Sequence, residues 1–313
     1  PAAVGEVGAA LIHAKFSAGA AMRLYGRSRT SGTPGKFSHT VRQPRGVTGL
    51  IVPANAPIAN IAWKCFPALI CGNTVVLKSS EDAPAIASLF AEITKEAGLP
   101  DGVLNVVHGA GPEAGSALVE DTRVALISFT GSTQVGKAIG EVCGRRLGRV
   151  SLELGGKNAL VVCDDADIDK AVHWASLSAF SNAGQRCAAA SRVLVFEQVY
   201  DTFLEKLIAK AEGLNLGVGK DSDLGPVVSE KQRQSILDDI SNAIAEGGKV
   251  ECGGVAATSA GLEHGYYVLP TVISGLGAES DLCSKEVFGP VVSVHRIRDL
   301  PSALSIANNT KFG

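Results

Sequence analysis

The chain has 313 residues, of which 46% are hydrophobic and 19% charged, a composition that excludes an intrinsically disordered protein and allows two ordinary domains. A formal net charge of −2, with no basic cluster interleaved with aromatic residues, argues against a nucleic-acid partner. The apolar stretch at residues 47–71 is interrupted by prolines, asparagines and a lysine, so it lacks the roughly 18 continuous apolar residues of a membrane span. We therefore expect a globular protein with no membrane partner.

The cysteines and histidines argue against a disulfide framework and against a metal site. Seven cysteines is an odd number, and none of them forms a C-x-x-C pair. This usage favours a reducing compartment, and we expect the cytoplasm. The six histidines are scattered without H-E-x-x-H or a similar spacing, so we predict no metal ligand among them.

The first half of the chain alternates short β-branched runs with longer helical segments. The expected strands are residues 46–52, 73–78, 102–107, 124–130 and 149–154, and the expected helices are residues 58–72, 83–98 and 133–146. This alternation predicts βαβ units, a mostly parallel sheet and right-handed crossovers. The predicted fold class is therefore α/β, with a Rossmann-like layered domain.

The pattern starts again after Glu153, which indicates a second α/β domain. A strand is expected from residue 158, a helix over 168–179, a strand over 191–197 and a helix over 199–212. We place the boundary so that residues 1–152 form the first domain and residues 153–313 the second. Glu153 and Cys187 then lie at or just beyond the boundary, where clefts between α/β domains often hold the chemistry.

Cys187 is the candidate nucleophile, and Glu153 is its candidate base. A thiol with a pKa of roughly 8.5 needs a base, a cation or a helix N-terminus to react near neutrality. Arg186 is a neighbouring cation, Gly184 permits a tight turn, and the small residues 188–190 are expected to begin a helix near the sulfur. The alternative is that Cys187, like most free cysteines, is a small buried hydrophobe.

The segment FTGSTQVG is a candidate pyrophosphate loop. It places Gly131 and Gly136 after an apolar strand and at the start of a helix, where backbone N–H groups and the helix dipole bind phosphates. The spacing departs from G-x-G-x-x-G, because Thr133 occupies the second glycine position. A helix N-cap formed by Ser132 or Thr133 is an equally good interpretation of this segment alone.

The segments LKSSE and PANAP supply further candidate site residues. Lys78 ends a strand and Glu81 follows three residues later, at the sheet edge where open α/β folds bind ligands, although a solvated strand end explains both residues too. Asn55 lies between two prolines that restrict the backbone, so its amide is suited to an oxyanion hole. Capping of a turn is the alternative role for Asn55.

Five motifs occur in the order typical of one enzyme family. These motifs are LKSSE, FTGSTQVG, SLELGGKN, NAGQRC and EVFGPV. From about residue 25 onward the chain resembles the NAD(P)-dependent aldehyde dehydrogenases. The resemblance implies an NAD-binding domain in residues 1–152, a catalytic domain in residues 153–313 and part of an oligomerisation arm of extended strands at about residues 27–46, which composition alone predicts to be a loop. It also implies further segments beyond both ends of these 313 residues, and a homodimer or homotetramer.

The resemblance assigns a role to each candidate residue. It implies that Cys187 is the nucleophile, Glu153 the base and Asn55 an oxyanion donor. The implied cofactor-binding residues are Lys78, Glu81, Gly111, Gly131, Ser132, Gly136, Glu286 and Phe288. Of these, Lys78 and Glu81 would hold the adenosine ribose, which favours NAD over NADP because a carboxylate there repels a 2′-phosphate. Glu286 would bind the nicotinamide ribose, and Phe288 would pack on the nicotinamide ring.

The implied reaction is oxidation of an aldehyde to a carboxylic acid through a thiohemiacetal and a thioester on Cys187, with water activated by Glu153. The family usually has Trp and Phe beside the oxyanion asparagine, whereas this chain has Ala54 and Ala56, so we expect more room in the substrate pocket. Two alternatives are a catalytically silent homologue and a thiol esterase that needs no cofactor. Intact Cys187, Glu153 and Asn55 argue against the first, and the candidate cofactor residues argue against the second.

Overall fold

The computed structural model describes residues 2–259 and 261–312. The chain divides into two compact units, Pro1–Leu154 and Gly155–Gly313. We call these unit 1 and unit 2. The division follows Leu154, because the last strand of unit 1 pairs with its neighbour up to Glu153, opposite Thr130. Glu153 is therefore in unit 1, whereas the sequence analysis assigned it to the second domain.

Unit 1 is built on a five-stranded parallel sheet, as the strand pattern predicts. In spatial order its strands are β5 (Leu104–Val107), β4 (Thr74–Lys78), β3 (Val47–Ile51), β6 (Val124–Thr130) and β7 (Arg149–Glu153). Strand β3 pairs with both β4 and β6, and the chain proceeds outward from this pair in opposite directions. The strand order therefore reverses between β3 and β6, as in a Rossmann-like fold.

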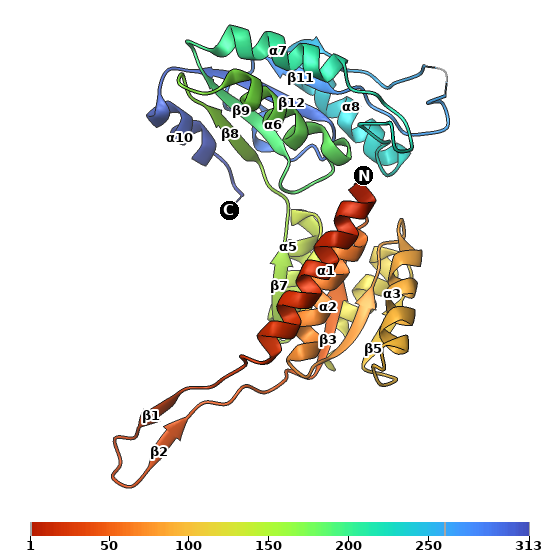
Figure 1. The fold of residues 1–313 in the computed structure, drawn as a ribbon, viewed down its shortest axis with the longest axis vertical. Coiled ribbons are helices and arrows are strands. Elements are labelled where there is room, and N and C mark those ends of the chain that lie inside the picture. The colour runs from red at the N-terminus through yellow and green to blue at the C-terminus, as the bar shows by residue number, and fades with distance from the viewer. Residues whose placement is uncertain (1, 260, 313) are drawn as a thin grey trace. The chain divides into compact units, whose positions relative to one another are not determined.

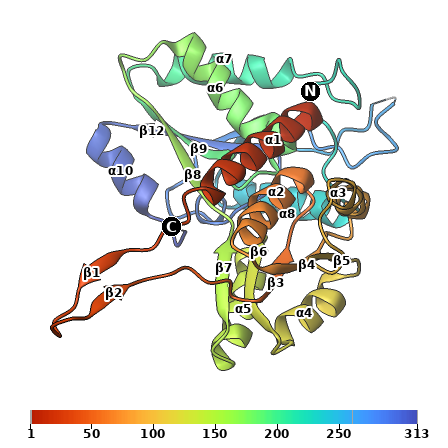
Figure 2. The same cartoon turned by 60° about the horizontal axis from the view of Figure 1, so that its bottom comes forward.

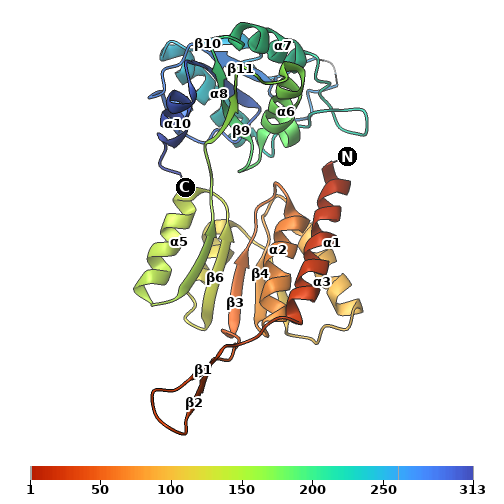
Figure 3. The same ribbon diagram turned by 60° about the vertical axis from the view of Figure 1, so that its left-hand side comes forward.

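Helices cover both faces of this sheet (Figure 3). They are α2 (Pro57–Ile70), α3 (Pro84–Glu96), α4 (Ser116–Glu120) and α5 (Thr133–Arg145), and a π-helical turn (Gly111–Gly115) precedes α4. Successive residues of β3 point to opposite faces. Leu50 and Val52 pack in one core with α2 and α3, whereas Ile51 packs in another core with α4 and α5.

The remaining elements of unit 1 precede its sheet. Helix α1 (Ala2–Ala21) packs along α2 (Figure 1). The rings of His13 and Trp63 meet edge to face between the two helices, with centroids 5.2 Å apart. Strands β1 (Ser28–Thr30) and β2 (Phe37–His39) then form an antiparallel hairpin whose strand residues are all exposed. The extended strands that the resemblance implied at residues 27–46 are therefore present.

Unit 2 contains a second five-stranded sheet. In spatial order its strands are β10 (Lys249–Cys252), β11 (Thr271–Ser274), β12 (Val291–Ile297), β9 (Ala190–Phe196) and β8 (Asn158–Val162). Its helices are α6 (Ile168–Phe180), α7 (Tyr200–Glu212), α8 (Glu230–Ala245), α9 (Asp281–Ser284) and α10 (Leu300–Asn308). All pairs are parallel except β10 with β11. The predicted α/β class is thus confirmed for both units.

The core of unit 2 also depends on strand alternation. Val193 and Val195 pack with Phe203 of α7 in the main core, whereas Leu194 points to the opposite face and packs with Ala303 of α10. Helices α6 and α7 lie side by side (Figures 1 and 2). Across the described ranges, no helix is long and apolar enough to cross a membrane.

A buried lysine links a helix of unit 1 to its sheet. Lys64 of α2 is 9% exposed, and its Nζ lies 2.8 Å from Ser128 Oγ of β6. Burial lowers the pKa of Lys64 from 10.5 to about 8, and the negative charge of Glu153 offsets part of that decrease. The ammonium form is therefore costly to keep in the folded chain.

This burial predicts how stability changes with pH. Between about pH 8 and the unfolded pKa, the unfolded chain binds more protons at Lys64 than the folded chain, so stability rises with pH. Relative to Lys64→Met, the wild type should gain up to about 3 kcal/mol of unfolding free energy between about pH 7 and pH 10.5. Guanidinium denaturation of both proteins at several pH values measures this difference. A difference that does not change with pH would contradict the assignment.

Candidate active site

The candidate residues of unit 1 gather at the carboxyl edge of its sheet. Asn55 follows β3, Lys78 and Glu81 lie at and after the end of β4, Gly111 follows β5, Gly131 and Ser132 follow β6, Gly136 lies in α5, and Glu153 ends β7. Parallel strands bring their carboxyl ends to one edge, and ligands of open α/β sheets bind there, where the strand order reverses. That point lies between the ends of β3 and β6 in unit 1.

Lys78, Glu81 and Gly111 form one hydrogen-bonded group. Lys78 Nζ lies 2.9 Å from Glu81 Oε2, and the Gly111 N–H donates to Glu81 Oε1 over 3.5 Å. The Lys78 side chain is 3% exposed, whereas that of Glu81 is 51% exposed. The ion pair therefore extends from the buried end of β4 to the protein surface. Hydrogen bonds from its own backbone N–H and from Lys78 lower the pKa of Glu81, which keeps the carboxylate charged.

Neighbouring side chains leave little room for a Cβ at the glycines of the candidate pyrophosphate loop. A Cβ on Gly131 would lie 2.4 Å from Phe129 Cζ, and one on Gly136 would lie 2.4 Å from Leu154 Cδ2. Ser132 is the N-cap of α5, and its Oγ accepts a hydrogen bond from the Val135 N–H over 3.4 Å. The capping role considered for Ser132 is thus present. With Ser132 as this cap, the loop lies at the N-terminus of α5, where a phosphate can bind.

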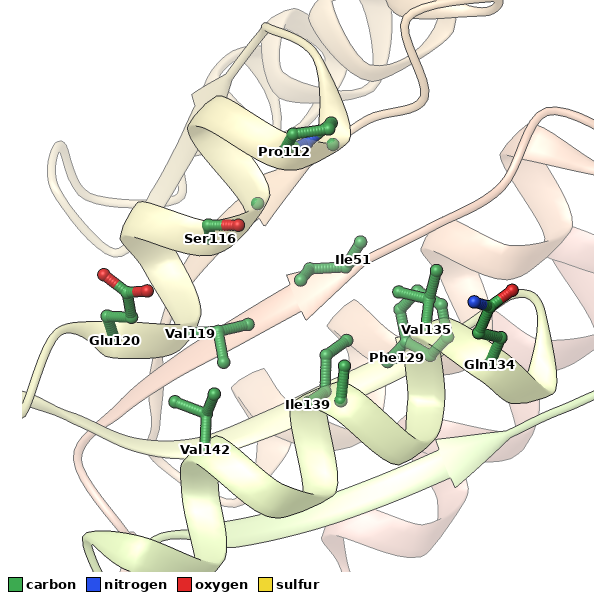
Figure 4. Close-up of a pocket in the computed structure, with 13 residues that line it drawn as sticks. Ile51, Pro112, Ser116, Val119, Glu120, Phe129, Gln134, Val135, Ile139 and Val142 are labelled. Atoms are coloured by element: carbon green, nitrogen blue, oxygen red, sulfur yellow. The ribbon is translucent and has the colours of Figure 1, made fainter.

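An apolar cavity of about 520 Å³ lies beside this loop (Figure 4). Pro112 and Val119 line it from the turn and helix after β5, and Val135 and Ile139 line it from α5. Ile51 at the end of β3 forms part of its wall. The cavity therefore lies at the reversal of strand order and has the volume of a small-molecule site. This cavity was not expected from the sequence, although the spacing of Val135 and Ile139 places both residues on one helix face.

Asn55 and Glu153 occupy the ends of two further strands of unit 1. Asn55 lies in a bend between β3 and α2 and is half-buried. Glu153 is exposed, its backbone carbonyl accepts a hydrogen bond from the Gly131 N–H over 3.1 Å, and its charge acts on Lys64. The two residues belong to unit 1, whereas Cys187 belongs to unit 2.

Cys187 lies in an exposed turn that leads directly into β9. The prediction that a helix begins at residues 188–190 is wrong, because Ala190 already pairs with Asn158 of β8. No helix N-terminus therefore follows the sulfur. Instead, the Asn158 amide donates to the Cys187 carbonyl over 2.6 Å and to the Ala189 carbonyl over 3.1 Å, which holds the turn. The Arg186 guanidinium donates to Ser181 Oγ over 2.8 Å.

The backbone before Cys187 is strained. Ala183 has a φ of 54°, which is uncommon for a residue with a side chain, and Gly184 follows with a φ of 67°. A Cβ on Gly184 would lie 2.0 Å from the Gly289 carbonyl oxygen. Glycine therefore allows the Cys187 loop to approach the segment that contains Phe288, which itself has a φ of 55°.

Three predicted residues of unit 2 meet in one place. Cys187, Glu286 and Phe288 line a cavity of about 20 Å³, large enough for about one water molecule. Burial raises the pKa of Glu286, although its Oε1 accepts a hydrogen bond from the Gly156 N–H over 3.3 Å. A Cβ on Gly155 would lie 2.0 Å from Glu286 Oε2, so this first glycine of LGGKN makes room for the carboxylate.

Two supporting residues of unit 2 were not found from the sequence. Asn158 holds the Cys187 turn, and Gln232 of α8 donates to the backbone carbonyls of Val287 and Phe288 over 3.1 Å and 3.2 Å. No spacing rule connects either residue to its target, because each contact joins distant parts of the chain. Within residues 2–259 and 261–312, no three His, Cys, Asp or Glu side chains form a group that could hold a metal ion.

Known proteins are similar in sequence to this chain over nearly its whole length. The chain is 40% identical to aldehyde dehydrogenase 1A1 of Mesocricetus auratus over 311 residues, which are 98% of this chain and 61% of that protein. It is 41% identical to the α-ketoglutarate semialdehyde dehydrogenase of Haloferax volcanii over 313 residues, which are 100% of this chain and 65% of that protein. The chain thus spans less than two thirds of the length of these relatives.

Solved structures agree with the sequence comparison. PnpE from Pseudomonas sp. WBC-3 in complex with nicotinamide adenine dinucleotide matches with a TM-score of 0.95 and 40% identity, over 98% of this chain and 63% of that one. The NAD⁺ complex of aldehyde dehydrogenase from Bacillus cereus matches with a TM-score of 0.95 and 35% identity, over 98% and 62%. The family model that describes the aldehyde dehydrogenase family matches residues 1–313. The chain therefore belongs to the aldehyde dehydrogenase family.

Proposed function

We propose that this protein oxidises an aldehyde to a carboxylic acid with NAD as the hydride acceptor. The observation that carries the proposal is the meeting of Cys187 with Glu286 and Phe288 around one small cavity. A nucleophile in that position lies beside the two residues expected to hold the nicotinamide end of a dinucleotide. A thiol esterase would have no use for this pairing.

The proposed chemistry begins at Cys187, whose thiolate attacks the aldehyde carbonyl. The Asn55 amide and the Cys187 backbone N–H stabilise the oxyanion that develops. NAD, when bound, would accept the hydride that the thiohemiacetal on Cys187 loses as it becomes a thioester. Glu153 then accepts a proton from the water that hydrolyses this thioester. We favour hydrolysis over transfer to coenzyme A because a carboxylate base is present at Glu153.

Unit 1 is the proposed NAD-binding domain, and unit 2 is the proposed catalytic domain. The 520 Å³ apolar cavity suits a flat heterocycle such as adenine, and the N-terminus of α5 beside it suits a phosphate. Lys78 and Glu81 are already hydrogen-bonded at the edge of the sheet, where they would hold the ribose. Two similar structures contain NAD, which supports the same cofactor here.

Other parts of the chain support proposals about assembly, cellular compartment and substrate size. The exposed hairpin of β1 and β2 is proposed to add to the sheet of another subunit in a homodimer or homotetramer, because exposed strands offer unpaired backbone groups. All seven cysteines are free thiols, which supports a cytoplasmic, reducing environment. Ala54 and Ala56 flank Asn55 with little side-chain volume, so we propose that the pocket accepts bulky aldehydes.

The charge of Glu81 predicts a cofactor preference. Glu81→Gln keeps an acceptor for Lys78 but removes the repulsion of a 2′-phosphate. Because the side chain is 51% exposed, solvent screens that repulsion, and we expect the NADP to NAD ratio of kcat/KM to rise only about two- to fivefold. Steady-state kinetics with both cofactors measures the ratio. An unchanged ratio would place Glu81 away from the ribose.

The role of Glu153 provides the direct test of the proposed reaction. In Glu153→Gln the amide cannot accept the proton of water, so hydrolysis of the thioester should slow by about 10²-fold or more while the first turnover remains fast. Stopped-flow absorbance should then show a burst of NADH followed by slow turnover.

Glu141→Gln is the matched control, because Glu141 is exposed on α5 and its carboxylate pairs with Arg145 of the same helix. This control should behave like the wild type. Equal loss of the burst and of steady turnover in Glu153→Gln would show that Glu153 acts before the thioester forms, and it would contradict the assigned role.

A further inference from the structure

Helix α2 begins two residues after Asn55, and its N-cap side chain makes no capping hydrogen bond. Its N-cap residue is Ala56, which has no side-chain oxygen, and its first residue is Pro57, which has no N–H. The N–H groups of Ile58 and Ala59 are therefore left without the usual N-cap acceptor. Within a buried turn, such donors need a partner from another part of the chain.

Glu6 of α1 is that partner. Its Oε1 accepts a hydrogen bond from the Ile58 N–H over 2.7 Å and from the Ala59 N–H over 3.2 Å. These are the two groups that a Ser, Thr or Asp at the N-cap would satisfy. The negative charge also lies at the positive end of the helix dipole, which strengthens both hydrogen bonds. A residue 52 positions earlier in the chain thus caps α2.

Asn60 holds the same turn from inside the helix. The Ala56 carbonyl accepts hydrogen bonds from the Asn60 backbone N–H over 3.0 Å and from the Asn60 side-chain amide over 2.9 Å. The backbone that follows Asn55 is therefore fixed on both sides, at Ala56 by Asn60 and at the next two N–H groups by Glu6. Because capping comes from α1, position 56 is free to carry a small residue beside Asn55.

We propose that Glu6 is a positioning residue for the Asn55 amide. It holds the first turn of α2, and that turn sets the direction in which the Asn55 side chain points. The inference rests on the proposed oxyanion role of Asn55. Loss of one oxyanion donor typically costs about 10²–10³ in rate, so a misdirected donor should cost a measurable part of that factor.

A double-mutant cycle between Glu6 and Asn55 tests this coupling in the holoenzyme with NAD and a small aldehyde. In the background that retains Asn55, Glu6→Ala should lower kcat/KM for the aldehyde by about tenfold. In the Asn55→Ala background it should lower kcat/KM by less than about twofold, because no amide donor remains to be positioned. Glu6→Gln keeps an acceptor and should retain activity within about threefold of the wild type. The Kd for NAD, measured by titration calorimetry, should not change in any of these variants.

Asn73→Ala provides the matched control for a purely structural effect. Asn73 Oδ1 also accepts two backbone N–H groups, those of Arg45 over 2.6 Å and Gly46 over 3.1 Å, but it does so at the amino ends of β3 and β4. Asn73→Ala should lower the unfolding midpoint as Glu6→Ala does, yet leave kcat/KM unchanged.

Each remaining outcome overturns the inference in a recognisable way. If Glu6→Ala reduces kcat/KM equally with and without the Asn55 amide, Glu6 does not act through Asn55, although the proposed function stands. If Glu6→Ala has no kinetic effect while Asn55→Ala does, the turn does not need the cap. If Asn55→Ala itself keeps full activity, the oxyanion role in the proposed function is wrong, and the inference falls with it.

Discussion

The parallel pairing of β3 with both β4 and β6 is the constraint on which the candidate site of unit 1 depends. Parallel strands need crossovers, and each crossover returns the chain so that all carboxyl ends meet at one edge. The reversal of strand order between β3 and β6 leaves space there, and the apolar cavity lies in that place. Residues far apart in the sequence, such as Glu81 and Gly111, become hydrogen-bonded neighbours for this reason.

In unit 2 the candidate site depends on the close approach of two backbone segments. The Cys187 loop can lie against the segment of Phe288 only because Gly184 has no side chain and adopts a positive φ. Gly155 leaves space for the Glu286 carboxylate in the same way. Left-handed residues with side chains, Ala183 and Phe288, show that this geometry is held at a cost in local strain.

The regular parts of the structure were predictable from the sequence. Strands β3 to β9 and helices such as α2 and α5 follow from alternating apolar runs, because the hydrophobic pattern and the secondary structure share one period. The helix expected after Cys187 is absent, because the pairing of β9 with β8 outweighs the helix preference of the three alanines. Tertiary pairing of this kind cannot be seen in a short window of sequence.

The supporting contacts of the site were not predictable. Glu6, Asn158 and Gln232 each act on backbone groups more than 25 positions away, and no motif records such a relationship. The residues proposed to act directly on the substrate stood out because their sequence contexts are unusual, such as a cysteine in a glycine-containing loop or an asparagine between prolines. The residues that hold them were missed because an ordinary Glu, Asn or Gln has many other uses.

The central claim is that Cys187 carries the substrate as a covalent acyl group. Mass spectrometry of peptides from Glu153→Gln, quenched with acid after mixing with NAD and an aldehyde, tests it most directly. The account predicts that the peptide containing Cys187 gains the mass of the aldehyde less two hydrogen atoms, and that this adduct requires NAD. An acyl group on another cysteine, or no adduct during a burst of NADH, would contradict the account.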